Sequence, residues 1–151
     1  MELWFSHGVN PKNESYVYAL LPAMTEAETK AYYQNPDIEV LSNTADLQVV
    51  RDKKLNITGM VFWKAGSFGD ITVDKPMIVM TQENNGEFRI SVCDPTQKLS
   101  EANITVNKAL TAINKDEYMT IDSSASTRIS MDMNNSHGRT MEAVLFDTGD
   151  T

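Results

Sequence analysis

Residues 76–94 read PMIVMTQENNGEFRISVCD, and this stretch decides the fold. Two short runs rich in β-formers are separated by Asn84-Asn85-Gly86. Asn and Gly tolerate the positive φ that tight hairpin turns require, so the stretch predicts two antiparallel strands joined by a turn. In the second run Phe88, Ile90 and Val92 share one face, which predicts a strand that buries that face.

Similar short runs continue on both sides of this hairpin. Before it lie IEVLS (38–42), DLQVVRD (46–52) and LNITGMVFW (55–63), and after it ANITVNKAL (102–110), EYMTID (117–122) and STRISMDM (126–133). A second hairpin turn is expected at 134–138, leading into RTMEAVLF (139–146). Strands spaced about ten residues apart and joined by Gly, Asn and Pro turns predict an all-β antiparallel sandwich.

The N-terminal part combines one more strand with one short helix. SYVYALLP (15–22) is apolar on both faces, which predicts a strand inside a layered sandwich. A helix is expected near residues 25–34, with Thr25 and Glu28 forming a capping box. Asn35-Pro36 ends it. The polar run at 42–46 is the expected boundary between two structural parts.

Composition excludes several classes of function. The chain has 151 residues, 41% of them hydrophobic, and a net charge of −8. Such a surface repels phosphates and anionic lipids, so neither nucleic acid nor membrane is expected as a partner. Cys93 is the only cysteine, which excludes an internal disulfide and a cysteine-based zinc site. The aspartates follow no calcium-loop spacing and no phosphate-binding glycine motif occurs, so no metal and no cofactor is expected.

Two sets of residues are candidates for chemistry or binding. His7 and Tyr16 could act as a base and an acid if they lay within hydrogen-bond reach, although a histidine at a strand end also serves simply to stabilise a turn. Trp4-Phe5 and Phe62-Trp63 could stack on sugar rings, although at least one member of each pair must face a core. The residues by themselves therefore predict a β-sandwich without a self-sufficient active site.

Five blocks, taken in order, are similar to a known family. HGVNPKNESYVYALLP (7–22), the short helix, NPDIEVLSNTADLQVV (35–50), FWKAG (62–66) and ISVCDPTQ (90–97) resemble polysaccharide lyase family 8 over roughly residues 4–108. The resemblance implies that residues 1–44 form the last strands of a β super-sandwich domain and that residues 45–151 form the C-terminal β-sandwich domain. The first residues show no signal-peptide pattern, which agrees with this resemblance. The chain is therefore expected to be a fragment of a secreted or periplasmic enzyme.

The resemblance also implies a role. The family cleaves uronic-acid-containing polysaccharides by β-elimination, with catalytic Asn, Tyr, His and Arg residues on an N-terminal α/α toroid. None of these can be carried over to this chain, so His7 and Tyr16 are not expected to be the catalytic pair and the chain alone is expected to be inactive. Its expected partners are the toroid of the same parent protein and, through the parent, an acidic polysaccharide.

Four residues are candidates for substrate binding. Asn10 and Lys12 lie on a loop that could face the cleft of the full enzyme, and Trp4 and Trp63 could bind sugar directly. The alternative role for the chain is a carbohydrate-binding module that tethers the enzyme to polysaccharide. A third alternative is an interaction domain unrelated to sugar.

Overall fold

The computed structural model describes residues 4–147 and divides the chain into two units, 1–36 and 37–151. Over residues 4–36 the only regular element is helix α1 (Glu26–Gln34). Thr25 and Glu28 form the expected capping box, because the Thr25 hydroxyl accepts from the Glu28 N–H and the Glu28 carboxylate accepts from the Thr25 N–H. The predicted short helix is therefore confirmed.

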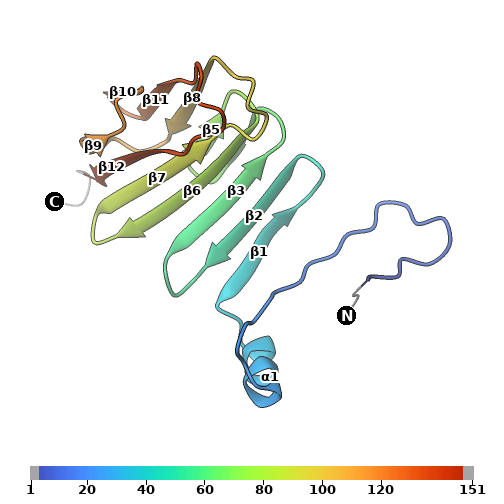
Figure 1. Ribbon diagram of the computed structural model, residues 1–151. Coiled ribbons are helices and arrows are strands. Elements are labelled where there is room, and N and C mark those ends of the chain that lie inside the picture. The colour runs from blue at the N-terminus through green and yellow to red at the C-terminus, as the bar shows by residue number, and fades with distance from the viewer. Residues whose placement is uncertain (1–3, 148–151) are drawn as a thin grey trace. The chain divides into compact units, whose positions relative to one another are not determined.

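The second unit is an antiparallel sandwich of two sheets (Figure 1). The seven-stranded sheet has the order β1-β2-β3-β6-β7-β12-β9. Its strands are β1 (Ile38–Asn43), β2 (Leu47–Asp52), β3 (Ile57–Phe62), β6 (Met77–Asn84), β7 (Glu87–Cys93), β12 (Met141–Asp147) and β9 (Leu110–Lys115). The five-stranded sheet has the order β10-β11-β8-β5-β4. Its strands are β10 (Met119–Ser123), β11 (Thr127–Asp132), β8 (Glu101–Val106), β5 (Ile71–Val73) and β4 (Gly66–Phe68). The predicted fold class is confirmed.

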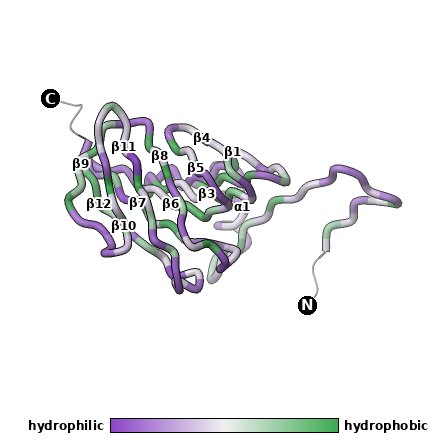
Figure 2. The backbone as a smooth tube through the Cα atoms, turned by 90° about the horizontal axis from the view of Figure 1, so that it is seen from above, coloured by the Kyte–Doolittle hydropathy of each residue, from purple (hydrophilic) through white to green (hydrophobic). Residues whose placement is uncertain are grey.

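The core lies between the two sheets because alternate residues of each strand point inward. Figure 2 shows hydrophobic and hydrophilic residues interleaved along the strands. In the seven-stranded sheet the buried positions include Val49, Phe62 and Ile90, and in the five-stranded sheet Ile104 and Ile129. Over the described residues, the buried members of this cluster run from Val49 to Leu145, all within the second unit.

The hairpin of the opening stretch has the predicted geometry. Asn84 pairs with Glu87, so Asn85 and Gly86 are the two loop residues, with φ of 51° and 80°. Positive φ at both positions is typical of a type I′ turn, which matches the twist of the strands it connects.

One predicted strand and one predicted hairpin turn differ from the structure. ANITVNKAL (102–110) does not form one strand: β8 ends at Val106 and the chain crosses to the other sheet, where β9 begins at Leu110. Thr127 holds this crossing, because its buried hydroxyl donates to the Lys108 carbonyl and accepts from the Leu110 N–H, each at 2.8 Å. The turn at 134–138 is likewise no hairpin, since it joins β11 of one sheet to β12 of the other.

The segment 15–22 also differs from its prediction. It belongs to neither sheet, and Tyr16, Val17, Tyr18 and Leu20 are each more than half exposed. A segment with two apolar faces forms a strand only where neighbours supply a hydrogen-bond ladder, and neither sheet supplies one here.

The two units divide at residue 36, eight residues before the expected domain boundary at 44. β1 pairs with β2 through Val40 opposite Val50, so residues 38–43 join the larger sheet. The assignment of the preceding residues to a super-sandwich domain stays a prediction.

Candidate functional site

His7 and Tyr16 lie near each other within an aromatic group. Their ring centroids are 6.3 Å apart, while Phe5 stacks on Tyr16 at 5.0 Å. His7 Nδ1 lies 3.8 Å from a Glu14 carboxylate oxygen, at the long end of the range for an ion pair. The group therefore consists of stacked rings that hold the two arms of the 4–18 loop together.

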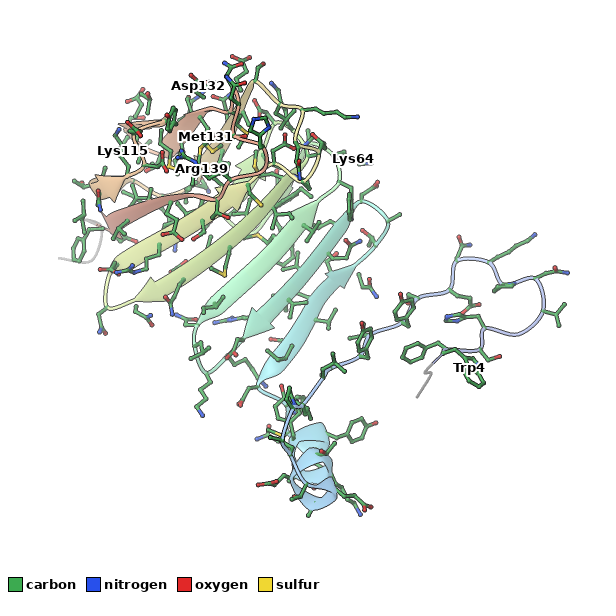
Figure 3. The ribbon with its side chains drawn as sticks, viewed as in Figure 1. Trp4, Lys64, Lys115, Met131, Asp132 and Arg139 are labelled. Carbon is green, nitrogen blue, oxygen red and sulfur yellow. The ribbon has the colours of Figure 1, made fainter. Side chains whose placement is uncertain are left out.

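Three of the predicted binding residues belong to this same loop. Trp4 is 79% exposed and projects from its start (Figure 3). Asn10 and Lys12 are exposed near its tip, where Asn10 adopts a φ of 55°. All three are accessible to a binding partner.

Trp63 belongs to the second unit, directly after β3. Phe62 is buried in the core while Trp63 is 54% exposed, so this aromatic pair divides between the inside and the outside as strand alternation requires. The Trp63 indole N–H donates to Gln48 Oε1 at 2.5 Å, and Lys64 pairs with Asp46 at 2.7 Å beside it. The ring is thus held in one orientation with much of its surface accessible.

The outer face of the seven-stranded sheet carries an apolar row. Val40, Val50, Gly59 and Met80 lie opposite one another on four adjacent strands, β1, β2, β3 and β6. Val40, Val50 and Met80 are each about two-fifths exposed, and Ile78 extends the apolar surface along β6. Contiguous apolar surface of this kind marks sites where proteins pack against other proteins.

The outer face of the five-stranded sheet is polar instead. In one row Thr120, Ser130 and Asn103 lie opposite one another on β10, β11 and β8. In the next row Asp122 lies opposite Arg128. The apolar row ends at β7, where Ser91 lies opposite Met80 and donates to Glu142 of β12. The sandwich therefore has an apolar patch on one outer face and a polar surface on the other.

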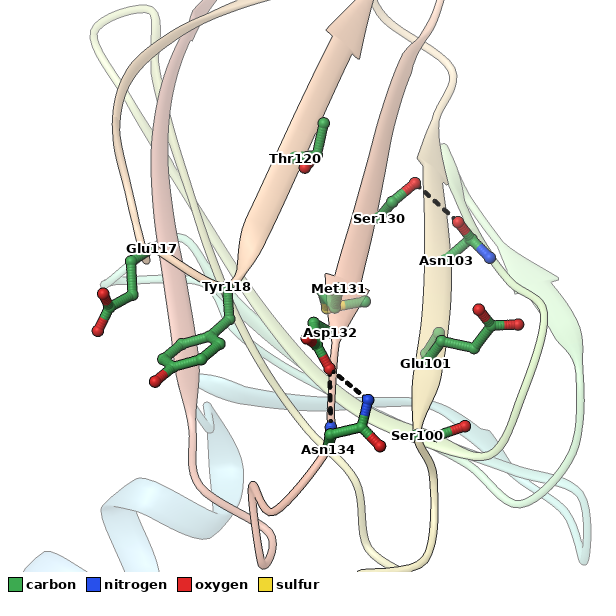
Figure 4. Close-up of a pocket in the computed structure, with 11 residues that line it drawn as sticks. Ser100, Glu101, Asn103, Glu117, Tyr118, Thr120, Ser130, Met131, Asp132 and Asn134 are labelled. Atoms are coloured by element: carbon green, nitrogen blue, oxygen red, sulfur yellow. Dashed lines mark hydrogen bonds between the residues drawn. The ribbon is translucent and has the colours of Figure 1, made fainter.

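A concave surface of about 490 Å³ lies on this polar face (Figure 4). Of the described residues that line it, Glu101, Glu117 and Asp132 carry a negative charge and none carries a positive one. Lys75 approaches from outside the lining, with its Nζ 3.8 Å from a Glu101 carboxylate oxygen. The aromatic member of the lining is Tyr118, which is 43% exposed.

None of the site residues predicted from the sequence lies on this surface. Alternation in STRISMDM already indicated that Ser130 and Asp132 share one face of a strand. Sequence alone could not show that β11 lies between β8 and β10, and that arrangement is what brings Glu101 and Tyr118 to the same surface.

Other charged side chains are engaged within the fold. Lys108 Nζ lies 3.1 and 3.2 Å from the two carboxylate oxygens of Glu83 and 3.7 Å from Asp70. Burial lowers the pKa of Lys108, but these carboxylates, Glu83 above all, outweigh it and the pKa is raised. This lysine therefore stays charged and links the connection between β8 and β9 to the end of β6 and to the turn between β4 and β5.

Among residues 4–147 the structure holds no group of three or more His, Cys, Asp or Glu side chains placed to bind a metal ion. Over the same residues no helix is long and apolar enough to cross a membrane.

Comparisons with known proteins identify relatives of the chain. The sequence model of the polysaccharide lyase family 8 C-terminal beta-sandwich domain matches residues 39–103. A xanthan lyase from Bacillus sp. (strain GL1) is 35% identical over 93% of the chain, and a chondroitinase-AC from Pedobacter heparinus is 33% identical over 70%. The chain spans only 16% of the length of each of these proteins.

Solved structures show the same fold. A Paenibacillus xanthan lyase superposes with a TM-score of 0.78 at 34% identity, over 85% of this chain and 13% of its own. A chondroitin AC lyase from Streptomyces coelicolor superposes with a TM-score of 0.81 over 94% of this chain and 19% of its own. Its identity of 20% supports the fold alone.

Proposed function

Because the chain belongs to polysaccharide lyase family 8 and carries that family's C-terminal β-sandwich domain, we propose that it is a non-catalytic part of a larger polysaccharide lyase. Its role is to support the catalytic domain, a helical toroid in this family, and the substrate cleft of that enzyme. The parent enzyme cleaves a uronic-acid-containing polysaccharide by β-elimination and is secreted or periplasmic.

The apolar row on the outer face of the seven-stranded sheet carries this proposal. Val40, Val50 and Met80 expose hydrocarbon in one row across the sheet. Gly59, which has no side chain, lies in this row between Val50 and Met80. Covering such a surface contributes about 25 cal/mol for each Å² removed from water. The chain spans about one-sixth of its relatives, so the remainder of the parent enzyme is the surface that covers it.

The exposed apolar segment 15–20 supports the same reading. Tyr16, Val17, Tyr18 and Leu20 present apolar side chains from an extended stretch, as a strand does before it pairs with a sheet. We assign this segment, with residues 1–36 in general, to the super-sandwich of the parent enzyme.

A charged substitution in the apolar row tests the supporting role. Met80→Asp in the longer enzyme that contains this chain should cost about 1–3 kcal/mol of stability, because it buries an unpaired charge at the interface. In the isolated chain the same substitution faces water and should leave the thermal midpoint nearly unchanged. Differential scanning calorimetry of both proteins measures the contrast.

Ile113→Asp is the matched control, since Ile113 is 60% exposed on β9 of the same sheet but lies outside the row. Equal effects of Met80→Asp and Ile113→Asp in the longer enzyme would contradict the proposed interface. The isolated chain should also release no unsaturated product from chondroitin sulfate, hyaluronan or xanthan, as followed by ultraviolet absorbance. Turnover by a clean preparation would contradict the non-catalytic role.

A carbohydrate-binding module is the second candidate function, and Trp63 favours it. Its ring is flat, more than half exposed and held by Gln48, which suits stacking on the apolar face of a sugar ring. Trp4, Asn10 and Lys12 offer a second binding set on the loop of the first unit. Loss of oligosaccharide binding in Trp63→Ala would distinguish this function from a purely supporting one.

A further inference from the structure

We propose that the concave surface formed by β8, β10 and β11 binds neutral sugar residues, with Tyr118 as the stacking ring and the surrounding carboxylates as acceptors for sugar hydroxyls. This site lies on the polar outer face of the sandwich. It is separate from Trp63 and from the loop that carries Trp4, and it goes beyond the supporting role proposed above.

The shape and position of the surface suit a saccharide. Its volume of about 490 Å³ falls within the range of small-ligand sites, about 300–1,000 Å³. Seven of its lining residues stand on β8, β10 and β11, whose hydrogen-bond ladder fixes their positions. Tyr118 and Glu117 stand on the turn before β10, which the Asp116 carboxylate braces through the Tyr118 N–H.

The charge of the surface selects the class of ligand. Glu101, Glu117 and Asp132 supply acceptor oxygens, which suit hydroxyl donors. Lys75 lies 3.8 Å from Glu101 and Arg139 pairs with Asp116, so Glu117 and Asp132 are the carboxylates that disfavour uronate or sulfate groups. Their carboxylates are not gathered into a metal-binding group among the described residues. A neutral polyhydroxyl ligand therefore fits better than a polyanion or a metal ion.

Tyr118 is held in place for stacking. The Arg139 guanidinium lies 4.6 Å from the centre of its ring, and Arg139 Nη2 donates to Asp116 Oδ1 at 3.0 Å. The Tyr118 backbone N–H donates to the same Asp116 oxygen at 3.0 Å. One carboxylate thus binds both the Tyr118 backbone and the cation that lies over one face of the ring, while Tyr118 as a whole is 43% exposed.

Other polar side chains of this surface are held by hydrogen bonds within the protein. The Ser130 hydroxyl donates to Asn103 Oδ1 at 2.8 Å, and Asn103 Nδ2 donates to Asp74 at 2.7 Å. Asp132 Oδ1 accepts from both the backbone and the side-chain nitrogen of Asn134, as Figure 4 shows. Preordered acceptors reduce the entropy lost on binding.

Titration of the ¹⁵N-labelled 151-residue chain with cellotetraose and with maltotetraose tests the site by NMR. Amide shifts should map to residues around Tyr118 for at least one of these neutral oligosaccharides, with a Kd of about 0.1–1 mM. The affinity should not depend on the salt concentration, because the oligosaccharide carries no charge to pair with the protein. A hyaluronan tetrasaccharide should cause no shift at this surface.

Three variants separate the site from a structural effect. Tyr118→Ala should weaken binding by about fivefold or more through loss of the stacking ring, whereas Tyr118→Phe should bind nearly as the parent chain does. Trp63→Ala should leave binding at this surface unchanged. Circular dichroism shows whether each variant is folded. If Tyr118→Ala is not, Tyr118→Leu takes its place, because it keeps an apolar side chain but removes the flat ring, and it should weaken binding likewise.

Several outcomes would overturn the proposal. These are no shift with either neutral oligosaccharide, equal affinity in Tyr118→Ala, or shifts confined to residues around Trp63. Stronger binding of the hyaluronan tetrasaccharide than of the neutral sugars would overturn it as well, because Glu117 and Asp132 should disfavour a polyanion.

Discussion

Asp94 shows how one side chain organises a loop in this protein. It is 2% exposed, and its two carboxylate oxygens accept four hydrogen bonds. The donors are the N–H and hydroxyl of Thr96 and the N–H groups of Lys98 and Leu99. Burial raises the pKa of Asp94, but these four donors outweigh it and the pKa is lowered.

Asp94→Asn should lower the free energy of unfolding by about 2–3 kcal/mol at neutral pH. The Lys98 and Leu99 N–H groups both point at Oδ2, each at 2.8 Å, and an amide nitrogen placed there cannot accept from them. Urea unfolding of parent and variant measures the difference. Asp122→Asn, at an exposed position on β10, is the control and should change stability little.

The Asp94 carboxylate also predicts part of the loss of folding stability at low pH. Because the folded pKa of Asp94 is lowered, its contribution is complete above the unfolded value of about 3.9 and is lost as pH falls through the folded value. The stability gap between parent and Asp94→Asn should therefore narrow below about pH 4. A gap that is constant down to the acid transition would contradict this linkage.

At the scale of elements, the hairpin between β6 and β7 could be predicted from the sequence, whereas the strands β4 and β5 and the break between β8 and β9 could not. Asn85 and Gly86 are adjacent in sequence and their chemistry is local, so the turn could be recognised from the residues alone. The short strands β4 and β5 were missed because three residues carry too little periodicity to detect. The break between β8 and β9 depends on Thr127, which lies 17 residues beyond Leu110 and is brought there only by folding.

Gly86→Ala should lower the free energy of unfolding by about 1–2 kcal/mol, because a Cβ is strained at its φ of 80°. A Cβ there would also lie 3.0 Å from the ring of Phe146. Gly69→Ala is the matched control, since its φ is 54° but nothing lies within 4 Å of the added atom. Chemical denaturation should give a larger loss for Gly86→Ala.

The Phe146→Leu background isolates the steric part of that loss. Removing the ring should bring the cost of Gly86→Ala down to that of Gly69→Ala, and a cost that stays the same would show that Phe146 is not involved.

At the scale of the whole molecule, the two units differ in what stabilises them. Among the described residues the fully buried core of the second unit begins at Val49, with Leu47 packed partly buried against it, and helix α1 has no buried residue. A chain that begins at Asp37 should therefore unfold in one cooperative transition, with a free energy of unfolding within about 1 kcal/mol of the full chain. Differential scanning calorimetry checks this, and a broad, non-cooperative transition would contradict it.

The sequence by itself determined the antiparallel strands, the hairpin at 84–87, the capped helix and the family, because each depends on local patterns or on the order of residues along the chain. It also required that at least one of Phe62 and Trp63 face a core. Only the tertiary structure decided that Phe62 faces the core while Trp63 is exposed, which connections cross between the sheets, and that an apolar row forms on the outer face of the seven-stranded sheet. These properties depend on which strands become neighbours, and that choice is made by long-range pairing that no short stretch encodes.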